Sequence, residues 1–199
     1  AEIFGESDLR LARSLTALGV LYREQGRYRD ASALFGRALS VTEKAVPPGD
    51  PGLVPALNNL GAAWFQLGQA SAAEPLFRRA MAIAENALGY DDSSTATSMA
   101  NLAAVYQARA RFAEAEPLYR GAIRTYEKAL GAADPAVARP LSSLAGLLRE
   151  QGRYRDAEPL YRRALSIVER ALGPAHVQMA LPLGGLAALH TAQGRYRDA

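Results

Sequence analysis

The sequence repeats itself at a fixed interval. The stretch REQGRYRDA occurs at 23–31 and again at 149–157. A shorter copy, QGRYRDA, occupies 193–199, and the step from Gln151 to Gln193 is one third of the step from Arg23 to Arg149. The repeat period is therefore the separation between Gln151 and Gln193. A period of this length is typical of a solenoid, in which small structural units stack along one axis, and not of a globule with a single core.

Several columns of the repeat keep one type of residue in every unit. One column is always leucine, the next is always glycine or alanine, a third is always alanine, and a fourth is always aromatic. In that order, the columns are Leu18, Leu60, Leu102, Leu144 and Leu186; Gly19, Gly61, Ala103, Ala145 and Ala187; Ala31, Ala73, Ala115, Ala157 and Ala199; and Phe35, Phe77, Tyr119 and Tyr161. Chance does not fill so many columns in register, so the chain is expected to consist of copies of one structural unit.

Each unit is predicted to form two helices joined by a tight turn. In the first unit Leu11, Leu15, Leu18 and Tyr22 recur at helical spacing and are expected to point into the stack. A glycine in the turn can adopt the left-handed conformation that ends a helix, whereas the third unit has Ala110 there, which predicts either strain or a different turn conformation. A loop column precedes each first helix and is expected to supply N-caps; its members are Asp8, Asp50, Asp92, Asp134 and His176.

The order of these residues resembles the tetratricopeptide repeat. In the first unit the matching positions are Leu18, Gly19, Tyr22, Gly26, Tyr28, Ala31, Phe35 and Ala38. The usual period is about 34 residues, and the longer unit here, with LNNLG, EQGRY and AEPLYRRAL, is similar to the kinesin light chain type. The resemblance covers essentially the whole chain. It implies an all-α fold, a right-handed superhelical solenoid of antiparallel helix pairs.

The repeat phase also predicts how the chain is divided. AEIFGESD at 1–8 aligns with EKAVPPGD at 43–50, so 1–8 is expected to be the tail of a preceding repeat. Within one solenoid domain we expect repeats at 9–50, 51–92, 93–134 and 135–176, and the first helix of a truncated fifth repeat at 177–199. Because this last helix is apolar, we expect a fragment of a longer protein whose open end permits head-to-tail association; the alternative is that the helix is itself the cap.

Nothing in the composition indicates an enzyme. The chain has no cysteine and only two histidines, and we expect His176 to be a loop or cap residue and His190 a packing residue. We therefore predict no catalytic residues, no metal site and no cofactor.

The net charge of +3 and pI of about 9.3 allow acidic partners without indicating nucleic acid, and no segment is apolar enough to predict a membrane span. The paired arginines at 78–79 and 162–163 are expected on a solvated convex face; a nucleic-acid patch is the alternative, but no stacking aromatic residues are interleaved with them. The absence of cysteine and of an export signal fits a cytoplasmic location, and the Ala-, Arg- and Leu-rich composition fits a bacterial source.

The concave face is the better candidate for a binding site. In repeats of this kind the first helices line the inner surface, and one stripe of these helices carries polar side chains on a floor of small residues. The predicted peptide-binding residues of this groove are Arg13, Asn58, Asn59, Phe65, Thr97, Asn101, Arg139, Ser143 and Arg149. Asparagine can pair with the backbone of an extended peptide, and arginine can clamp a carboxylate. The alternative is that Asn58 and Asn59 merely cap or solvate the helix surface.

Two functions fit these features. The first is a non-catalytic scaffold whose groove binds an extended peptide segment of a partner protein; Arg13, Arg139 and Arg149 would favour an acidic segment. The second is a regulatory or self-associating arm of a larger multidomain signalling protein, such as an NTPase or a protease.

Overall fold

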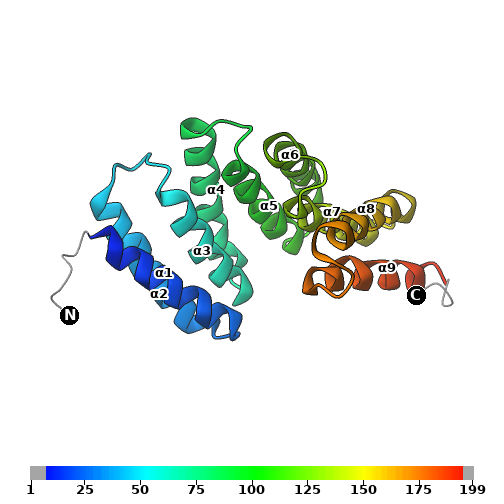
Figure 1. Ribbon diagram of the computed structural model, residues 1–199, viewed down its shortest axis with the longest axis horizontal. Coiled ribbons are helices and arrows are strands. Elements are labelled where there is room, and N and C mark those ends of the chain that lie inside the picture. Colours follow the sequence, from blue (N-terminus) through cyan, green and yellow to red (C-terminus); the bar gives the residue numbers. More distant parts are fainter. Residues whose placement is uncertain (1–7, 195–199) are drawn as a thin grey trace.

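The computed structural model describes residues 8–194, which fold as helices joined by short turns (Figure 1). The α-helices, in chain order, are α1 (Leu9–Glu24), α2 (Tyr28–Ala45), α3 (Leu53–Gln66), α4 (Ala70–Ala87), α5 (Ser93–Ala108), α6 (Phe112–Leu130), α7 (Ala138–Glu150), α8 (Tyr154–Leu172) and α9 (Ala180–Ala192). Short 3-10 turns at Pro135–Val137 and Val177–Met179 precede α7 and α9. The predicted tail of a preceding repeat lies outside the described residues except for Asp8, and so do residues 195–199 of the last repeated motif.

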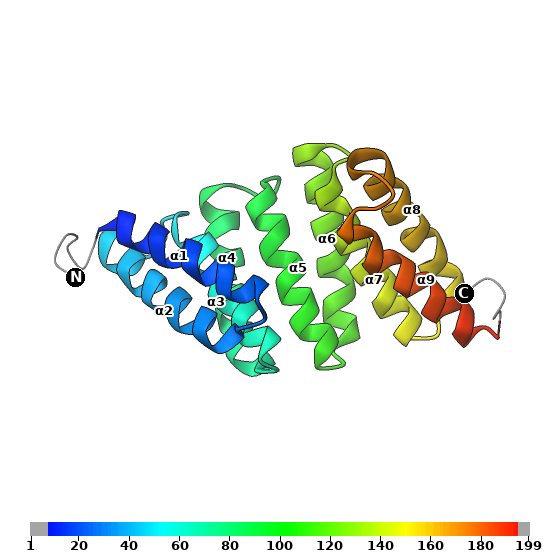
Figure 2. The ribbon, with the colours of Figure 1, turned by 60° about the horizontal axis from the view of Figure 1, so that its bottom comes forward.

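Consecutive helices pack as antiparallel pairs, and each pair stacks on the next. The closest neighbours are α1 with α2, α3 with α4, α5 with α6 and α7 with α8, and each pair also contacts the helix that follows it. Figures 1 and 2 show that the pairs form one curved array with α1 and α9 at opposite ends. The predicted all-α solenoid of helix pairs is confirmed.

The loop column supplies a side-chain acceptor at the start of each unit. Asp8 and Asp92 are N-caps of α-helices, and Asp134 and His176 are N-caps of the 3-10 turns, but the N-cap of α3 is Gly52 and not the predicted Asp50. The side chains of Asp8, Asp50, Asp92 and Asp134 each accept a hydrogen bond from the backbone N–H two residues later, at 2.7–2.8 Å. His176 does the same through Nδ1, at 3.3 Å from the Gln178 nitrogen. A side-chain acceptor here satisfies one of the N–H groups that the first turn of a helix leaves without a partner, which explains why the column recurs.

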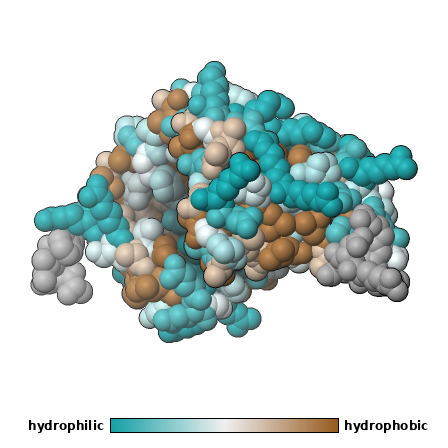
Figure 3. Space-filling model, turned by 45° about the vertical axis from the view of Figure 1, so that its right-hand side comes forward, coloured by the Kyte–Doolittle hydropathy of each residue, from teal (hydrophilic) through white to brown (hydrophobic). Residues whose placement is uncertain are grey.

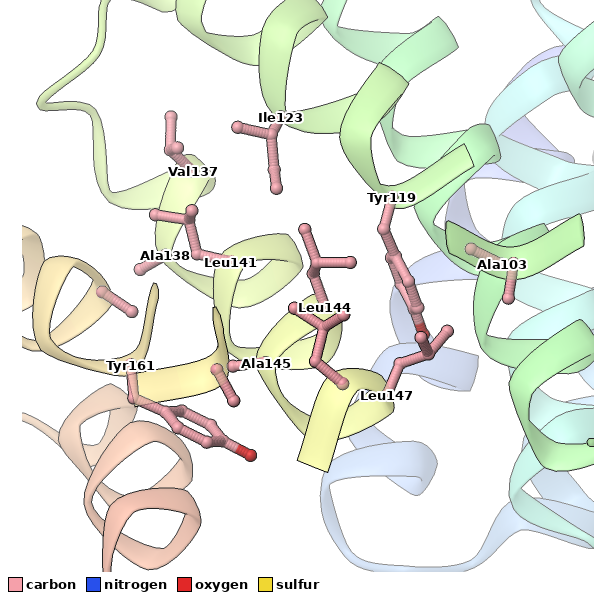
Figure 4. Packing of buried hydrophobic residues seen from close by; sticks show 14 of the residues in the cluster. Ala103, Tyr119, Ile123, Val137, Ala138, Leu141, Leu144, Ala145, Leu147 and Tyr161 are labelled. Carbon is pink, nitrogen blue, oxygen red and sulfur yellow. The ribbon is translucent and has the colours of Figure 1, made fainter. Parts of the chain in front are cut away.

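The small and aromatic columns meet inside each helix pair. A Cβ atom added to Gly19 would lie 2.6 Å from Cε1 of Phe35, and one added to Gly61 would lie 2.7 Å from Cε1 of Phe77. The phenylalanine ring thus occupies the space that a larger residue would need, which explains the glycine in the first two units. In the third and fourth units the small residue is alanine and the aromatic partner is tyrosine; Figure 4 shows both tyrosines in the core cluster.

The leucine column depends on a neighbouring unit for its burial. Leu60, Leu102 and Leu144 are buried, and Leu60 packs in one cluster with Ala31 and Phe35 of the preceding pair. Leu18 is 40% exposed, since no described helix packs on the outer side of α1. The expectation that Leu18 points into the stack is therefore wrong for this first unit.

The turn between α5 and α6 is strained, which is one of the two outcomes that its sequence predicts. Ala110 has a φ of +55°, the one positive φ at a non-glycine residue in the range 8–194. The equivalent glycines, Gly26, Gly68 and Gly152, have φ of +74° to +76°. A left-handed conformation costs an alanine roughly 1–2 kcal/mol because its Cβ crowds the following carbonyl.

Ala110→Gly is therefore expected to raise the free energy of unfolding by about 0.5–1 kcal/mol, after the greater freedom of glycine in the unfolded chain is subtracted. Chemical denaturation of the two proteins measures the difference. Gly68→Ala, which creates the same strain in another turn, should destabilise; a loss of stability in Ala110→Gly would contradict the interpretation of this turn.

Candidate functional site

A hollow on the inner side of the array joins four alternate helices. Its volume is about 690 Å³, and it extends from Phe65 on α3 past α5 and α7 to Gly184 and Ala188 on α9. These four helices are the first helices of successive units, and they follow one another along the curved array in Figure 1. The predicted residues Arg139, Ser143 and Arg149 line this hollow together with Phe65.

A smaller hollow of about 70 Å³ adjoins the large one and shares Arg139 and Ser143 with it. Thr97 and Asn101 line this smaller space. Six of the predicted residues thus surround one continuous region on the first helices. Arg13 lies elsewhere, in a separate pocket of about 480 Å³ between α1 and α3.

Asn58 differs most from the expectation. Its side chain is only 9% exposed, and its amide donates to Oγ of Ser98 at 3.0 Å. It also accepts a hydrogen bond from the amide of Asn101 at 3.3 Å, so it ties α3 to α5. Asn59 is half-buried, and its Oδ1 accepts a hydrogen bond of 3.5 Å from the guanidinium group of Arg23. Asn58 therefore orients Asn101 from behind, while Asn101 and Asn59 remain partly accessible.

Two tyrosines of the aromatic column contribute to the hollow, although the sequence pattern assigns that column to packing. Tyr119 and Tyr161 both line it. The Tyr119 hydroxyl donates to Oε1 of Gln107 at 3.0 Å, and the amide of Gln107 donates to Glu150 at 3.0 Å. Burial raises the pKa of Tyr119 and of Tyr161 above the ordinary value of tyrosine, so both hydroxyls stay protonated at neutral pH. The change from phenylalanine to tyrosine in the third and fourth units is the signal that indicates these hydroxyls.

Arginines on the second helices and turns are largely neutralised by glutamates. Glu74 pairs with Arg78 at 2.9 Å, with Arg111 at 3.2 Å and with Arg109. Burial acts to raise the pKa of Glu74, but the hydrogen bond from Arg111 and the surrounding positive charges outweigh it, so the pKa is lowered. Glu116 repeats the arrangement one unit later, with Arg120 and Arg153, each at 2.8 Å.

Arginines on the inner surface lack such partners. Within residues 8–194, Arg13 and Arg139 form no ion pair or side-chain hydrogen bond. The Nε atom of Arg149 is buried and has no hydrogen-bond partner in the same range. The lining of the large hollow therefore contains two arginines without an ion-pair partner among residues 8–194, beside one acidic residue, Glu150, which accepts a hydrogen bond from Gln107.

Neither a cluster of metal ligands nor a membrane-spanning helix is found among residues 8–194. Between Asp8 and Gly194, no three histidine, cysteine or acidic side chains lie close enough together to hold a metal ion. None of the helices in that range is long and apolar enough to cross a bilayer. The hydropathy surface in Figure 3 shows hydrophobic patches between hydrophilic side chains on one face.

Comparison with known proteins identifies the type of repeat. Tetratricopeptide repeat models match residues 11–52, 53–128 and 136–199. The crystal structure of BtubC (BKLC) from P. vanneervenii is similar, with a TM-score of 0.79 and 22% identity over 96% of this chain and 76% of that one. A kinesin light chain-like protein with nearly identical TPR-like repeats from Podospora anserina has a TM-score of 0.75 and 24% identity, over 95% of this chain and 89% of that one. No curated protein matches the sequence. Since the repeat models match most of the chain, it belongs to the tetratricopeptide repeat family.

Proposed function

We propose that this chain is a non-catalytic interaction scaffold whose inner groove binds an extended, acidic peptide segment of a partner protein. Tetratricopeptide repeats are generally protein-interaction modules, and no catalytic family matches the chain. The observation that carries the proposal is the hollow of about 690 Å³ lined by Arg139 and Arg149, which form no ion pair with a described acidic side chain and outnumber Glu150, the one described acidic residue in the lining. A groove of this kind attracts a ligand of opposite charge.

The lining side chains suit the parts of an extended peptide. Arg139 and Arg149 would bind carboxylates, because the guanidinium fork matches both oxygens. Asn101 and Ser143 would pair with peptide N–H and C=O groups, and Asn59 would do so on the adjoining helix. Asn58 would act through Asn101, which already donates to it at 3.3 Å. Phe65 offers an apolar contact at one end of the hollow, while Thr97 and Arg13 would extend the surface.

Asn59→Ala with Asn101→Ala is expected to weaken binding of acidic peptides by about tenfold, since two amide hydrogen bonds are each worth about 0.5–1.5 kcal/mol. Fluorescence anisotropy with libraries of acidic and neutral peptides measures the affinities. The matched control is Asn86→Ala, which removes an exposed amide from α4, and it should have no effect. If the double variant bound acidic peptides as tightly as the parent protein, the ligand would not contact these asparagines. No binding by any peptide would reject the proposed function.

Self-association is a second candidate, and exposed leucines at both ends of the array favour it. Leu18 and Leu21 are 40% and 54% exposed on α1, and Leu181 and Leu183 are 52% and 50% exposed on α9. Apolar surface of this kind can join copies head to tail, or contact other parts of a larger signalling protein. Sedimentation velocity over a range of concentrations separates the candidates: growth in size with concentration supports self-association, and a constant monomer excludes it.

A further inference from the structure

Two pockets of the array occupy the same position in the repeat, three repeats apart. The first pocket, between α1 and α3, has a volume of about 480 Å³, and the second pocket, between α7 and α9, has about 290 Å³. The first pocket is defined by Ala12, Arg13, Thr16, Pro55 and Ala56. The second pocket is defined by the equivalent residues three repeats later, which are Ala138, Arg139, Ser142, Leu181 and Pro182. Each is mostly apolar and contains an arginine.

The two intervening positions are filled by side chains of the protein. Between α3 and α5 the residues equivalent to Thr16 and Ala56 are Asn58 and Ser98, and a hydrogen bond of 3.0 Å joins their side chains across the space. The chain therefore places larger or hydrogen-bonded side chains where the first and second pockets are open.

Tyr126 fills the position between α5 and α7. Its hydroxyl lies 2.6 Å from Oγ1 of Thr97, and only about 70 Å³ remains beside it. Every other unit has a smaller residue in this column; these are Thr42, Ala84 and Val168. Two open pockets thus flank two closed ones along the inner surface.

The charges of the open pockets differ. Asp50 lines the first pocket beside Arg13, whereas none of the acidic residues between Asp8 and Gly194 lines the second pocket around Arg139. We propose that one extended segment of a partner protein binds both pockets, with an apolar side chain in each and with a carboxylate beside the anchor that enters the second pocket. This inference rests on the proposed function, because it assumes that the ligand is a peptide in the groove.

The distance between the pockets sets the spacing of the anchors. With one helix-packing distance of about 8–10 Å taken for each step between neighbouring first helices, three steps span roughly 24–30 Å. An extended peptide advances about 3.3 Å per residue. Anchors separated by about eight residues therefore match the two pockets.

Synthetic peptides with two leucine anchors joined by a Gly/Ser spacer test the proposal on the unmodified chain. Anchors about 4, 8 or 16 residues apart are compared with peptides that have one anchor, each with either glutamate or glutamine beside the second leucine. We expect the spacing of about eight residues to bind at least about tenfold tighter than the one-anchor peptides, because the second anchor then binds intramolecularly. We also expect glutamate to bind more tightly than glutamine.

Variants that copy the side chains of a closed position into an open one test each pocket. Thr16→Asn with Ala56→Ser closes the first pocket in the manner of Asn58 and Ser98, and Ser142→Asn with Pro182→Ser does the same for the second. Each should reduce the affinity of the two-anchor peptide to that of a one-anchor peptide. Arg139→Gln, at an exposed residue, should remove the preference for glutamate over glutamine and leave the glutamine peptide unaffected. Circular dichroism and thermal unfolding are used to test whether each variant is folded.

The outcomes separate this inference from the proposed function. Acidic peptides that bind with no dependence on anchor spacing, or equally well to folded pocket-closing variants, would overturn the two-pocket inference and leave the groove function standing. A chain that binds no acidic peptide at all would reject both. The spacing series decides the matter on the unmodified protein even if a closing variant fails to fold.

Discussion

Gly61→Leu is expected to lower the free energy of unfolding by about 3 kcal/mol, at the upper end of the usual cost of overpacking a core. Even a single Cβ at this position would lie 2.7 Å from Cε1 and 2.9 Å from Cζ of Phe77. The Phe77 ring is buried and packs in the cluster that extends into the third and fourth units, so it cannot move aside without disturbing the next repeat. Urea denaturation followed by circular dichroism measures the change.

Gly36→Ala is the matched control for this prediction. Gly36 lies inside α2, and a Cβ atom there would have no neighbour within 4 Å. Because alanine favours a helix over glycine, this variant should gain about 0.5–1 kcal/mol. If Gly61→Leu proved as stable as the parent protein, the close contact between the glycine and phenylalanine columns would not be what limits residue size there.

Arg139→Glu is expected to reduce the affinity for acidic peptides by about tenfold to a hundredfold, since a hydrogen bond to a charged group is worth about 1.5–3 kcal/mol. Arg139 lines the large inner hollow, the small hollow beside it and the second pocket, so one substitution changes the charge of all three. Its side chain is exposed and has no ion-pair partner in the described residues, so thermal stability should change little. Anisotropy titration and thermal unfolding measure the two effects.

Arg124→Glu separates this local effect from the change in net charge. Arg124 is exposed on α6 and lines none of the inner hollows. Both substitutions change the net charge by the same amount, but only Arg139→Glu places a carboxylate where the ligand is expected. An equal loss of affinity in the two variants would mean that long-range attraction, and not contact in the groove, determines binding.

The repeated sequence by itself determined the local structure. Helix pairs, their N-caps and the strained turn at Ala110 follow from interactions between residues close in the chain. The close approach within each pair follows equally, because a glycine such as Gly61 recurs at a fixed offset from an aromatic ring such as Phe77. Such short-range rules act in the same way in every unit, and the repeat displays them several times in one chain.

Tertiary structure alone decided which side chains face the groove and which are buried in the packing between units. Adjacent positions on a helix differ in direction by only about 100°, so the stripe containing Asn58 and Asn59 could not be assigned to one surface from spacing. Packing buried Asn58 against Ser98 and left Asn59 half-exposed. It also brought the Tyr119 hydroxyl to the groove, and left pockets open at two of four equivalent positions. These outcomes depend on how the side chains of two neighbouring units fill one space, and that is a property of residues a whole repeat apart acting together.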